Sequence, residues 1–477
     1  MRRSLLRTGT ALAATVLLLG ACSGTPGQAA AERINVVMVL TDDLSMNLVQ
    51  HMPNVRALAA YGTTFSQYTV TDSLCCPSRS SILTGRFPHN TGVFTNSGDD
   101  GGFTVFAEEQ EKDTFATTLR SQGYRTAMMG KYLNGYQPAR DGVRPGWTEW
   151  DVAGNGYGQY NYDLNENGTV KHYGKTPADY LTTVIDGKAS SFITASAAAG
   201  DPFLLEVATF SPHGPYTPAP QDDEAFPGLT APRGPSFDKL SADAPAWLAS
   251  RPALTDQQKT TIDRIYRKRA QSVLSIDRLL GNLRQTLEKA GVADRTLVVF
   301  SSDNGFHLGE HRLAAGKQTA FDHDVHVPLV MAGPGVRPGA TVDTMVQNID
   351  LRPTFEQIGG VTSSPDVDGR SLVPLMRDGR ADGWKPIGLV EHHGPGHATD
   401  DPDRQDKASG MPPTYSALRA LGFTYVEYQN GDKEYYDRAT DPDELANTAG
   451  ALPADRAASL HATLERLRAC KGAAACN

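Results

Sequence analysis

The chain has 477 residues, too many for one small domain, and its 39% hydrophobic and 21% charged side chains, with 46 glycines and 30 prolines, exclude a fibrous or disordered protein. The formal net charge is −9, and the first 21 residues contain three arginines and no acidic residue, so the remainder is more acidic still. This charge argues against a nucleic acid as the main partner, but an anionic substrate stays open because a few cations in one pocket suffice to bind it.

The N-terminus has the pattern of a secretory signal. Three arginines precede an apolar run over residues 11–21 that is too short to span a membrane stably. The sequence LGAC at residues 19–22 resembles a bacterial lipobox, which implies cleavage before Cys22 and lipidation of Cys22; the alternative is a plain secreted protein cut nearby. We therefore expect a signal peptide over residues 1–21 and a flexible tether over 22–33. The protein is expected to be extracytoplasmic, and either held at the membrane by a lipid anchor alone or secreted.

Buried strands alternate with helices through most of the chain. Continuous apolar, β-branched runs predict strands of a mainly parallel sheet at residues 34–40 (INVVMVL), 203–210, 297–300 and 327–332. Helical patterns fall at residues 52–60, 114–121, 178–198 and 255–290. This alternation predicts an α/β sandwich around a large, mainly parallel sheet, in which ligands lie beyond the carboxyl ends of the strands.

A hairpin is expected at residues 160–173, where it turns at Asn167-Gly168.

The pattern changes in the last quarter of the chain. After residue 372, the expected elements are short strands at 387–392, 415–420, 423–429 and 434–438, and a helix over 454–468. We therefore divide the chain into a catalytic domain over residues 34–380 and a C-terminal α+β subdomain over 381–477 that is built on a smaller antiparallel sheet.

Polar residues directly follow two of the predicted strands. Asp42-Asp43 comes after the first strand, and Asp303-Asn304 comes after the strand at 297–300. Taken singly, each is a common helix cap or turn. Because the carboxyl ends of both strands meet at one edge, the four side chains predict an all-oxygen site, which suits Ca²⁺ or Mg²⁺ and does not favour zinc.

The most informative stretch is CCPSR, from Cys75 to Arg79, with Leu-Thr-Gly at residues 83–85. The two thiols alone could be ordinary buried cysteines, which is how most free cysteines behave. Their occurrence together with the oxygen-rich strand ends favours a catalytic function.

The order of the motifs along nearly the whole chain after residue 33 resembles the type I, formylglycine-dependent sulfatases. The matching stretches are Thr41-Asp42-Asp43, Cys75-Cys76-Pro77-Ser78-Arg79, Gly130-Lys131-Tyr132, Pro212-His213, Ser302-Asp303-Asn304-Gly305 and Lys317. The resemblance implies an alkaline-phosphatase-like sandwich and the hydrolysis of sulfate esters. It also implies that a formylglycine-generating enzyme oxidises Cys75 to an aldehyde. One hydroxyl of the aldehyde hydrate would attack sulfur, and the other would collapse to expel sulfate.

The same resemblance assigns roles to individual residues. The residues implied for a Ca²⁺ ion, or Mg²⁺, are Asp42, Asp43, Cys75 as formylglycine, Asp303 and Asn304. The residues implied for catalysis are Cys75, Arg79, Lys131, His213 and Lys317. Arg79 would position the hydrate, and the other cations would contact the sulfate and the leaving oxygen, where charge develops. His213 or Lys317 would donate a proton to the leaving alcohol, and Asp303 or Asp42 would act as the base.

One departure from the family narrows the resemblance. Many sulfatases have a histidine two residues after the Gly-Lys lysine, where this chain has Leu133. This variant resembles the N-acetylglucosamine-6-sulfatase and heparan sulfate 6-O-endosulfatase branch, as do YNY at 160–162 and DYLT at 179–182. The expected substrate is therefore a sulfated sugar or another sulfated small molecule. Asn134 and His307 are expected to join Lys131, His213 and Lys317 in binding it.

The chain contains five cysteines and no Cys/His zinc spacing. With Cys22 lipidated and Cys75 modified, as the two resemblances imply, the expected disulfide joins Cys470 to Cys476 in an oxidising compartment.

Other functions stay open from the sequence. A phosphodiesterase or phosphonate monoester hydrolase would use the same nucleophile and metal, because the groups that stabilise sulfate and phosphate overlap. Another alternative is an arylsulfatase of broad specificity, whose substrates need not contain a sugar. If Cys75 stays a thiol, the protein would be a surface lipoprotein that binds sulfated glycans without cleaving them.

Overall fold

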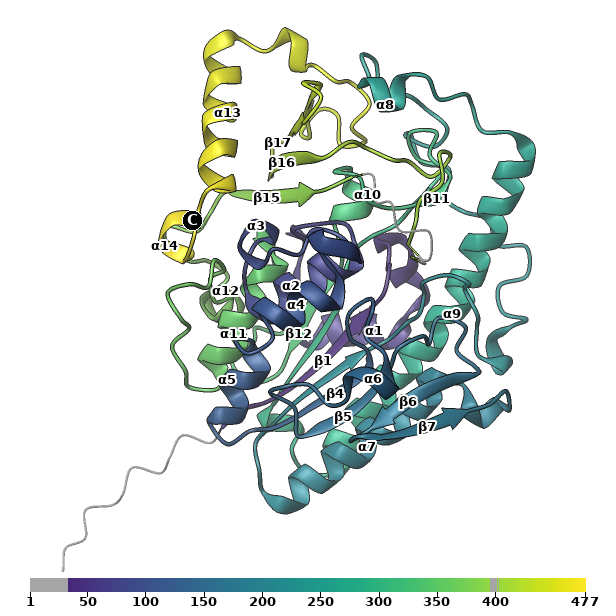
Figure 1. The fold of residues 1–477 in the computed structure, drawn as a ribbon, viewed down its shortest axis with the longest axis vertical. Helices are drawn as coiled ribbons and strands as arrows, with labels where there is room; N and C mark the ends of the chain where they lie inside the picture. Colours follow the sequence, from purple (N-terminus) through teal and green to yellow (C-terminus); the bar gives the residue numbers. More distant parts are fainter. Residues whose placement is uncertain (1–32, 395–400, 402) are drawn as a thin grey trace, which may run out of the picture. The chain divides into compact units, whose positions relative to one another are not determined.

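The computed structural model describes residues 33–394, 401 and 403–477. A sheet of ten strands runs through this part of the chain (Figure 1). In spatial order its strands are β13 (Ala340–Val342), β2 (Thr63–Phe65), β12 (Leu329–Ala332), β9 (Thr296–Ser302), β1 (Asn35–Thr41), β8 (Phe203–Ala208), β4 (Arg125–Lys131), β5 (Glu149–Ala153), β6 (Tyr162–Glu166) and β7 (Thr169–Tyr173).

The centre of the sheet is parallel and its flanks are mixed. Strands β9, β1, β8, β4 and β5 run parallel to one another. The strand predicted at 327–332 lies at 329–332 but runs antiparallel to β9, so its inclusion among the parallel strands was wrong. The predicted hairpin turns at Asn167-Gly168, both with positive φ, as expected, and it extends the large sheet by pairing with β5.

Alternate side chains of β1 enter two different cores. Val36, Met38 and Leu40 pack on one face, and Val37 and Val39 pack on the other. The helices on the first face are α2 (Cys75–Thr84), α4 (Gly102–Glu109), α5 (Phe115–Ser121), α11 (Leu351–Ile358) and α12 (Val373–Asp378). The helices on the second face are α1 (Pro53–Tyr61), α7 (Leu181–Ala199) and α9 (Asp256–Lys289). Burial on both faces explains why the central strands are apolar throughout, and it confirms the predicted sandwich.

A smaller antiparallel sheet follows in the chain. Its strands are β15 (Ile387–His392), β16 (Tyr415–Ala420), β17 (Phe423–Tyr428) and β18 (Lys433–Asp437). Helix α13 (Ala454–Arg468) packs against this sheet through Leu460, Leu464 and Leu467. A disulfide joins Cys470 to Cys476 directly after α13.

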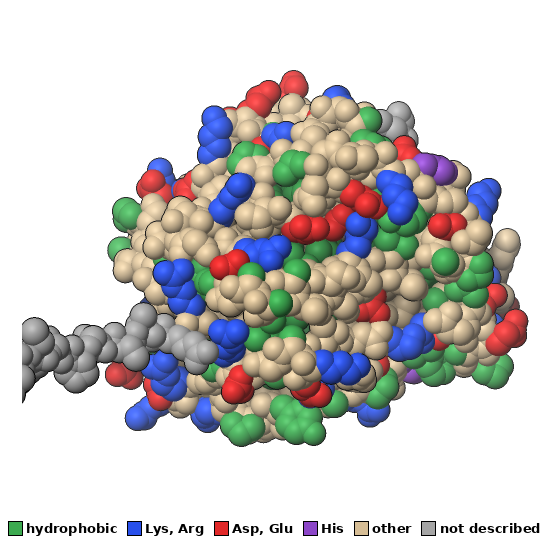
Figure 2. All heavy atoms as spheres, turned by 90° about the horizontal axis from the view of Figure 1, so that it is seen from below, with side chains coloured by type: hydrophobic (Ala, Val, Ile, Leu, Met, Phe, Trp, Pro, Cys, Tyr) green, Lys and Arg blue, Asp and Glu red, His purple; other side chains and the backbone are tan. Residues whose placement is uncertain are grey.

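The remaining strands and α-helices are short. They are β3 (Tyr68–Thr69), β10 (His307–Leu308), β11 (Ala315–Gly316), β14 (Val346–Gln347), α3 (Pro88–Thr91), α6 (Pro138–Asp141), α8 (Ala246–Ala249), α10 (Asp322–Val325) and α14 (Ala473–Cys476). Within the described ranges, no helix combines the length and the apolar character needed to cross a membrane. The predicted signal peptide and Cys22 lie outside the described residues. On the face shown in Figure 2, acidic and basic side chains are interspersed.

Candidate active site

The registers of the central strands align their carboxyl ends at one edge of the sheet. Thr41 of β1 pairs with Ser302 of β9, and Leu40 pairs with Ala208 of β8. The predicted site residues at or beyond these ends are Asp42 and Asp43 after β1, Lys131 at the end of β4, His213 after β8, and Asp303 and Asn304 after β9. The structure therefore gathers residues from four separate stretches of sequence.

Cys75 is the first residue of α2 and is fully buried. Its thiol donates to Asp42 Oδ1 at 3.2 Å, and Lys317 Nζ donates to its sulfur at 2.9 Å. Burial, followed by the carboxylates of Asp403 and Asp42, raises the pKa of the Cys75 thiol well above its ordinary value. The unmodified side chain is therefore a protonated thiol at neutral pH and a poor nucleophile.

Arg79 lies one turn further along α2 and bonds to residues at the ends of two strands, β9 and β4. Its Nε donates to Asp303 Oδ2 at 2.8 Å, and its Nη1 donates to the carbonyl oxygen of Lys131 at 2.9 Å. Burial alone would lower the pKa of Arg79, but Asp303 and Asp42 outweigh it and raise the pKa above its usual value. Arg79 Nη2 is buried without a hydrogen-bond partner in the described part of the chain, so a donor is left for a ligand.

Two buried lysines neutralise the paired aspartates. Lys131 Nζ lies 2.6 Å from Asp42 Oδ2, and Lys317 Nζ lies 2.6 Å from Asp43 Oδ1. Burial alone would lower the pKa of both lysines. Asp42 for Lys131, and Asp403 and Asp43 for Lys317, more than offset this effect and hold both pKa values well above 10.5. Both side chains therefore present positive charge next to Cys75.

The carboxylates fit a hard divalent cation. Ligand atoms of Asp42, Asp43, Cys75 and His213 all lie within 4.8 Å of one another. Asn304 donates through Nδ2 to Asp43 Oδ1 at 2.7 Å, which leaves its buried Oδ1 without a partner among the described residues. This orphaned amide oxygen beside two carboxylates is a donor set that suits Ca²⁺ or Mg²⁺.

Asp303 is engaged differently from the other predicted ligands. Its Oδ2 accepts from Arg79, and its Oδ1 accepts from the backbone N–H groups of Asp43 and Asn304 at 3.1 and 2.7 Å. These contacts fix the strand end on which Asn304 lies.

His213 is held by an aspartate that the sequence analysis missed. His213 Nε2 lies 2.5 Å from Asp403 Oδ1, and its Nδ1 lies 2.8 Å from the carbonyl oxygen of Gly214. Burial alone would lower the pKa of His213, but Asp403, Asp43 and Asp42 raise it to about 9. Asp403 also accepts from Lys317 Nζ at 2.7 Å. No motif marks Asp403, and its contact with His213 spans 190 positions of chain.

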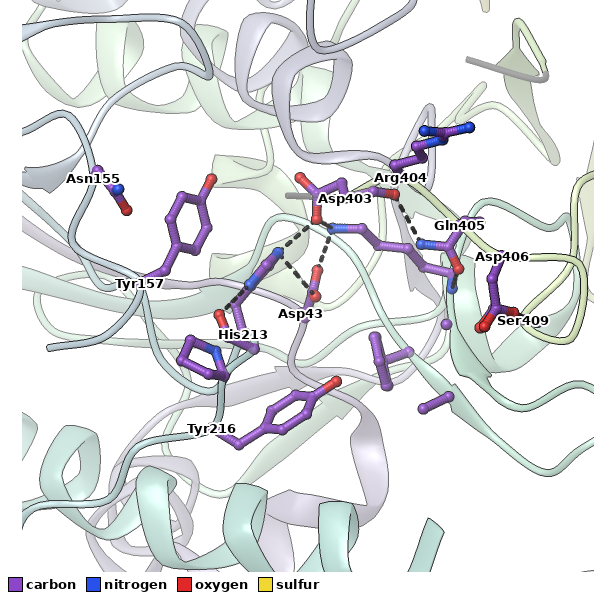
Figure 3. A pocket seen from close by; sticks show the side chains of 16 residues that line it. Asp43, Asn155, Tyr157, His213, Tyr216, Asp403, Arg404, Gln405, Asp406 and Ser409 are labelled. Carbon is purple, nitrogen blue, oxygen red and sulfur yellow. Dashed lines mark hydrogen bonds and ion pairs between the residues drawn. The ribbon is translucent and has the colours of Figure 1, made fainter. Parts of the chain in front are cut away.

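A cavity of about 380 Å³ reaches Asp43, His213, Lys317 and Asp403, whereas Cys75, Arg79 and Lys131 are buried and are not among its lining residues. Figure 3 shows His213, Asp43 and Asp403 pointing toward one another in its middle, with Tyr157 and Asn155 on one side and Gln405 on the other. Its lining residues are Asp43, Asn155, Tyr157, His213, Gly214, Pro215, Tyr216, Phe306, Ala315, Gly316, Lys317, Asp403, Arg404, Gln405, Asp406 and Ser409. Loops at the strand ends of the large sheet and the segment after β15 thus share one pocket.

The two further residues predicted to bind substrate differ in position. Asn134 lies beside the pocket, where its Nδ2 donates to Asp403 Oδ2 and to the Tyr157 hydroxyl. His307 is buried with Nδ1 at 3.0 Å from Asp324 and Nε2 at 2.7 Å from the Ser409 carbonyl. Both of its ring nitrogens are occupied and it does not line the described cavity, so this geometry does not support the prediction that His307 binds substrate.

Known proteins share both the sequence pattern and the fold. The family described as Sulfatase matches residues 34–361, and the N-sulphoglucosamine sulphohydrolase C-terminal family matches residues 309–470. The N-acetylglucosamine-6-sulfatase of Homo sapiens is 34% identical over 96% of this chain and 88% of its own length.

Two solved structures share the fold. BT4656, in complex with its substrate D-glucosamine-2-N,6-O-disulfate, superposes with a TM-score of 0.76 at 23% identity and covers 91% of this chain and 97% of its own. A phosphonate monoester hydrolase from Silicibacter pomeroyi superposes with a TM-score of 0.72 at 21% identity and covers 92% of this chain and 96% of its own.

The fold and the cationic pocket at the strand ends, together with these matches, define a sulfuric ester hydrolase. The chain belongs to the sulfatase family, as the order of its motifs predicts.

Proposed function

We propose that this sulfatase hydrolyses the sulfate ester of a sulfated sugar of the N-acetylglucosamine-6-sulfate type, after Cys75 has been converted to formylglycine. The observation that carries the proposal is the convergence of Lys317, Lys131 and His213 on Cys75 and its aspartates. Lys317 Nζ lies 2.9 Å from Cys75 Sγ, and Lys131 binds the aspartate that accepts from the thiol. The similarity to N-acetylglucosamine-6-sulfatase supports the sugar.

The same contacts support a division of roles. Lys131 and Lys317 bind sulfate oxygens, because they are buried cations beside the nucleophile position. His213, with its raised pKa, donates a proton to the departing sugar oxygen. Of the two aspartates considered as the base, Asp42 is favoured, because it accepts from Cys75 while both oxygens of Asp303 are already used.

Two groups that complete the chemistry also belong to the proposal. Formylglycine would supply a hydrate hydroxyl as nucleophile, with Arg79 nearby to orient it. A Ca²⁺ ion, or Mg²⁺, held by Asp42, Asp43 and Asn304 would supply Lewis acidity toward the sulfate oxygens. Asp303 would hold this site in shape through Arg79.

The maturation and location of the protein follow the same proposal. A formylglycine-generating enzyme would act on Cys75, and a lipid on Cys22 would anchor an extracytoplasmic protein. The catalytic domain over residues 34–380 and the subdomain over 381–477 would both contribute to the pocket, since Lys317 and Asp403 meet there.

The experiment combines mass spectrometry with sulfate release. The tryptic peptide 57–79 of protein purified from its own host should have the mass of an aldehyde at position 75. The protein should release sulfate from N-acetylglucosamine-6-sulfate. Cys75→Ala should abolish turnover, and Cys76→Ala, which changes the neighbouring buried thiol, should retain it. An aldehyde-bearing protein that cleaves phosphonate monoesters or phosphodiesters faster than any sugar sulfate would overturn the proposal.

A further inference from the structure

A second cavity of about 680 Å³ adjoins the active-site cavity. Its walls are the loop after β4, the loop before β6, and the β6–β7 hairpin. Its lining residues are Asn134, Gly135, Tyr136, Gln137, Pro138, Ala139, Gly154, Asn155, Tyr157, Asn161, Tyr162, Asp163 and His172. Asn155 and Tyr157 line both cavities, so the two cavities adjoin at the side of the site where Figure 3 shows these residues.

We propose that this second cavity binds an uncharged sugar unit next to the sulfated one, so that the preferred substrate is an oligosaccharide with a neutral neighbouring residue. The inference rests on the proposed function, since it extends the same substrate beyond its sulfate. Its location supports it. Lys131 Nζ lies 5.0 Å from the centre of the ring of Tyr157, which lines the second cavity, so a sulfate held by Lys131 would lie near this cavity.

The polar groups of the second cavity match sugar hydroxyls. Gln137, Asn155 and Asn161 are exposed residues that line the cavity, and their side-chain amides make no hydrogen bond within the described part of the chain, so they can bind a ligand in place of water. Each amide offers both donors and an acceptor, and a sugar hydroxyl needs both kinds of partner. Tyr157, which is partly exposed in the same wall, supplies apolar ring area for the carbon face of a sugar, whereas Tyr136 and Tyr162 are buried behind the wall.

The charge of the second cavity excludes an anionic neighbour. Among its described lining residues there is no lysine or arginine, and its one carboxylate, Asp163, lies 2.8 Å from His172 on the facing strand. The active-site cavity, in contrast, contains Lys317, His213 and Arg404. A uronic acid or a second sulfate in the second cavity would lose hydration and be repelled by the Asp163 carboxylate, and no lysine or arginine of the lining would compensate its charge.

The test compares four substrates on the full, matured protein with Ca²⁺ present. They are an aryl sulfate, N-acetylglucosamine-6-sulfate, a disaccharide that joins this sugar to a neutral hexose, and a disaccharide that joins it to a uronic acid. We expect kcat/KM to be about 10-fold higher for the neutral disaccharide than for the monosaccharide, as two or three added hydrogen bonds predict. The uronic acid disaccharide should show no such gain.

Two variants connect the preference to the cavity. Gln137→Ala should lower kcat/KM for the neutral disaccharide about 5-fold and leave the monosaccharide and aryl sulfate unchanged. Asp163→Lys should raise kcat/KM for the uronic acid disaccharide. The exposed Gln357→Ala, on α11, is the matched control and should change none of the four.

The outcomes separate the two proposals. Absence of turnover on every sulfate ester would overturn the proposed function itself. Equal kcat/KM for the monosaccharide and the neutral disaccharide would overturn the proposal that the second cavity binds a sugar, and so would a Gln137→Ala protein that keeps the disaccharide preference. Both results would leave the proposed sulfatase function in place.

Discussion

His213 Nε2 lies 2.5 Å from Asp403 Oδ1, which joins the loop after β8 to the segment after β15 at the centre of the pocket. Burial alone would raise the pKa of Asp403, but Lys317 and His213 hold it well below its usual range. The aspartate is therefore ionised and keeps His213 both oriented and protonated. We infer that Asp403 is a positioning residue for the proton donor.

Asp403→Asn should lower kcat on the sugar sulfate about 100-fold, because the proton donor loses its charged partner. An aryl sulfate has a leaving group that departs with little protonation, so its kcat should fall less than about 10-fold. Steady-state kinetics on both substrates check this difference.

The comparison variant is His213→Gln, which should show the same dependence on the leaving group. The double variant should be little worse than either single variant, because the two residues act as a unit. Equal losses on both substrates would indicate a structural role for Asp403 instead.

Under the proposed function, removal of a divalent cation should both inactivate and destabilise the protein. A ligand that binds only the folded state stabilises it by about 2.7 kcal/mol at 100 times its Kd. Thermal unfolding with and without a chelator, followed by addition of Ca²⁺ or Mg²⁺, measures this shift apart from activity. Asp43→Asn should weaken the response, and the exposed Asp163→Asn should keep it. A shift that is the same in both variants would argue against a site at Asp43.

Arg79→Lys should lower kcat about 100-fold although it keeps the charge, because a lysine cannot donate to Asp303 and to the Lys131 carbonyl at once. The variant should also unfold at lower temperature, since the pair is buried. Arg140→Lys is the matched control: Arg140 pairs with Asp141 at the surface, where such pairs contribute little. Unchanged kinetics in Arg79→Lys would contradict the assigned role.

Glu434 predicts a pH dependence of stability that is unrelated to catalysis. Burial raises the pKa of Glu434 to about 7, although Tyr428 and Tyr436 donate to it. The folded protein therefore binds a proton that the unfolded chain has already lost between about pH 4.5 and 7. Stability from this group is full below pH 4.5 and is lost as pH rises through 7, by up to about 3 kcal/mol.

Glu434→Gln stays neutral and should remove this loss. The variant should match wild type near pH 4.5 and be more stable near pH 8, as measured by denaturant unfolding at both values. If the free energies of unfolding of the two proteins changed with pH in parallel, the raised pKa of Glu434 would be contradicted.

Site residues that directly follow a buried strand can be predicted from the sequence. Asp42 and Asp303 are predictable because each comes at the end of an apolar run, and parallel strands end at one edge. Lys131 was found through its motif, whereas its strand was missed because RTAMMGK is neither continuously apolar nor alternating. The direction of β12 was wrong because an apolar run does not encode parallel or antiparallel pairing.

Long-range contacts explain the remaining differences. Asp403 lies in a polar segment without periodicity, and only the folded chain brings it to His213. His307 is two residues past a recognisable motif, but the sequence does not reveal that Asp324 and Ser409 occupy both ring nitrogens. Side-chain saturation of this kind depends on tertiary packing, which no local pattern reports.

The complete burial of Cys75 has a consequence for biosynthesis. Under the proposed function, an enzyme that oxidises this thiol needs access to it before α2 docks on the sheet. Lys317 and Asp403, which close over this region, are synthesised more than 200 residues after Cys75. The fraction of active molecules is then set by competition between conversion and folding. Two preparations with the same sequence and the same fold would differ in specific activity according to how quickly each chain folded.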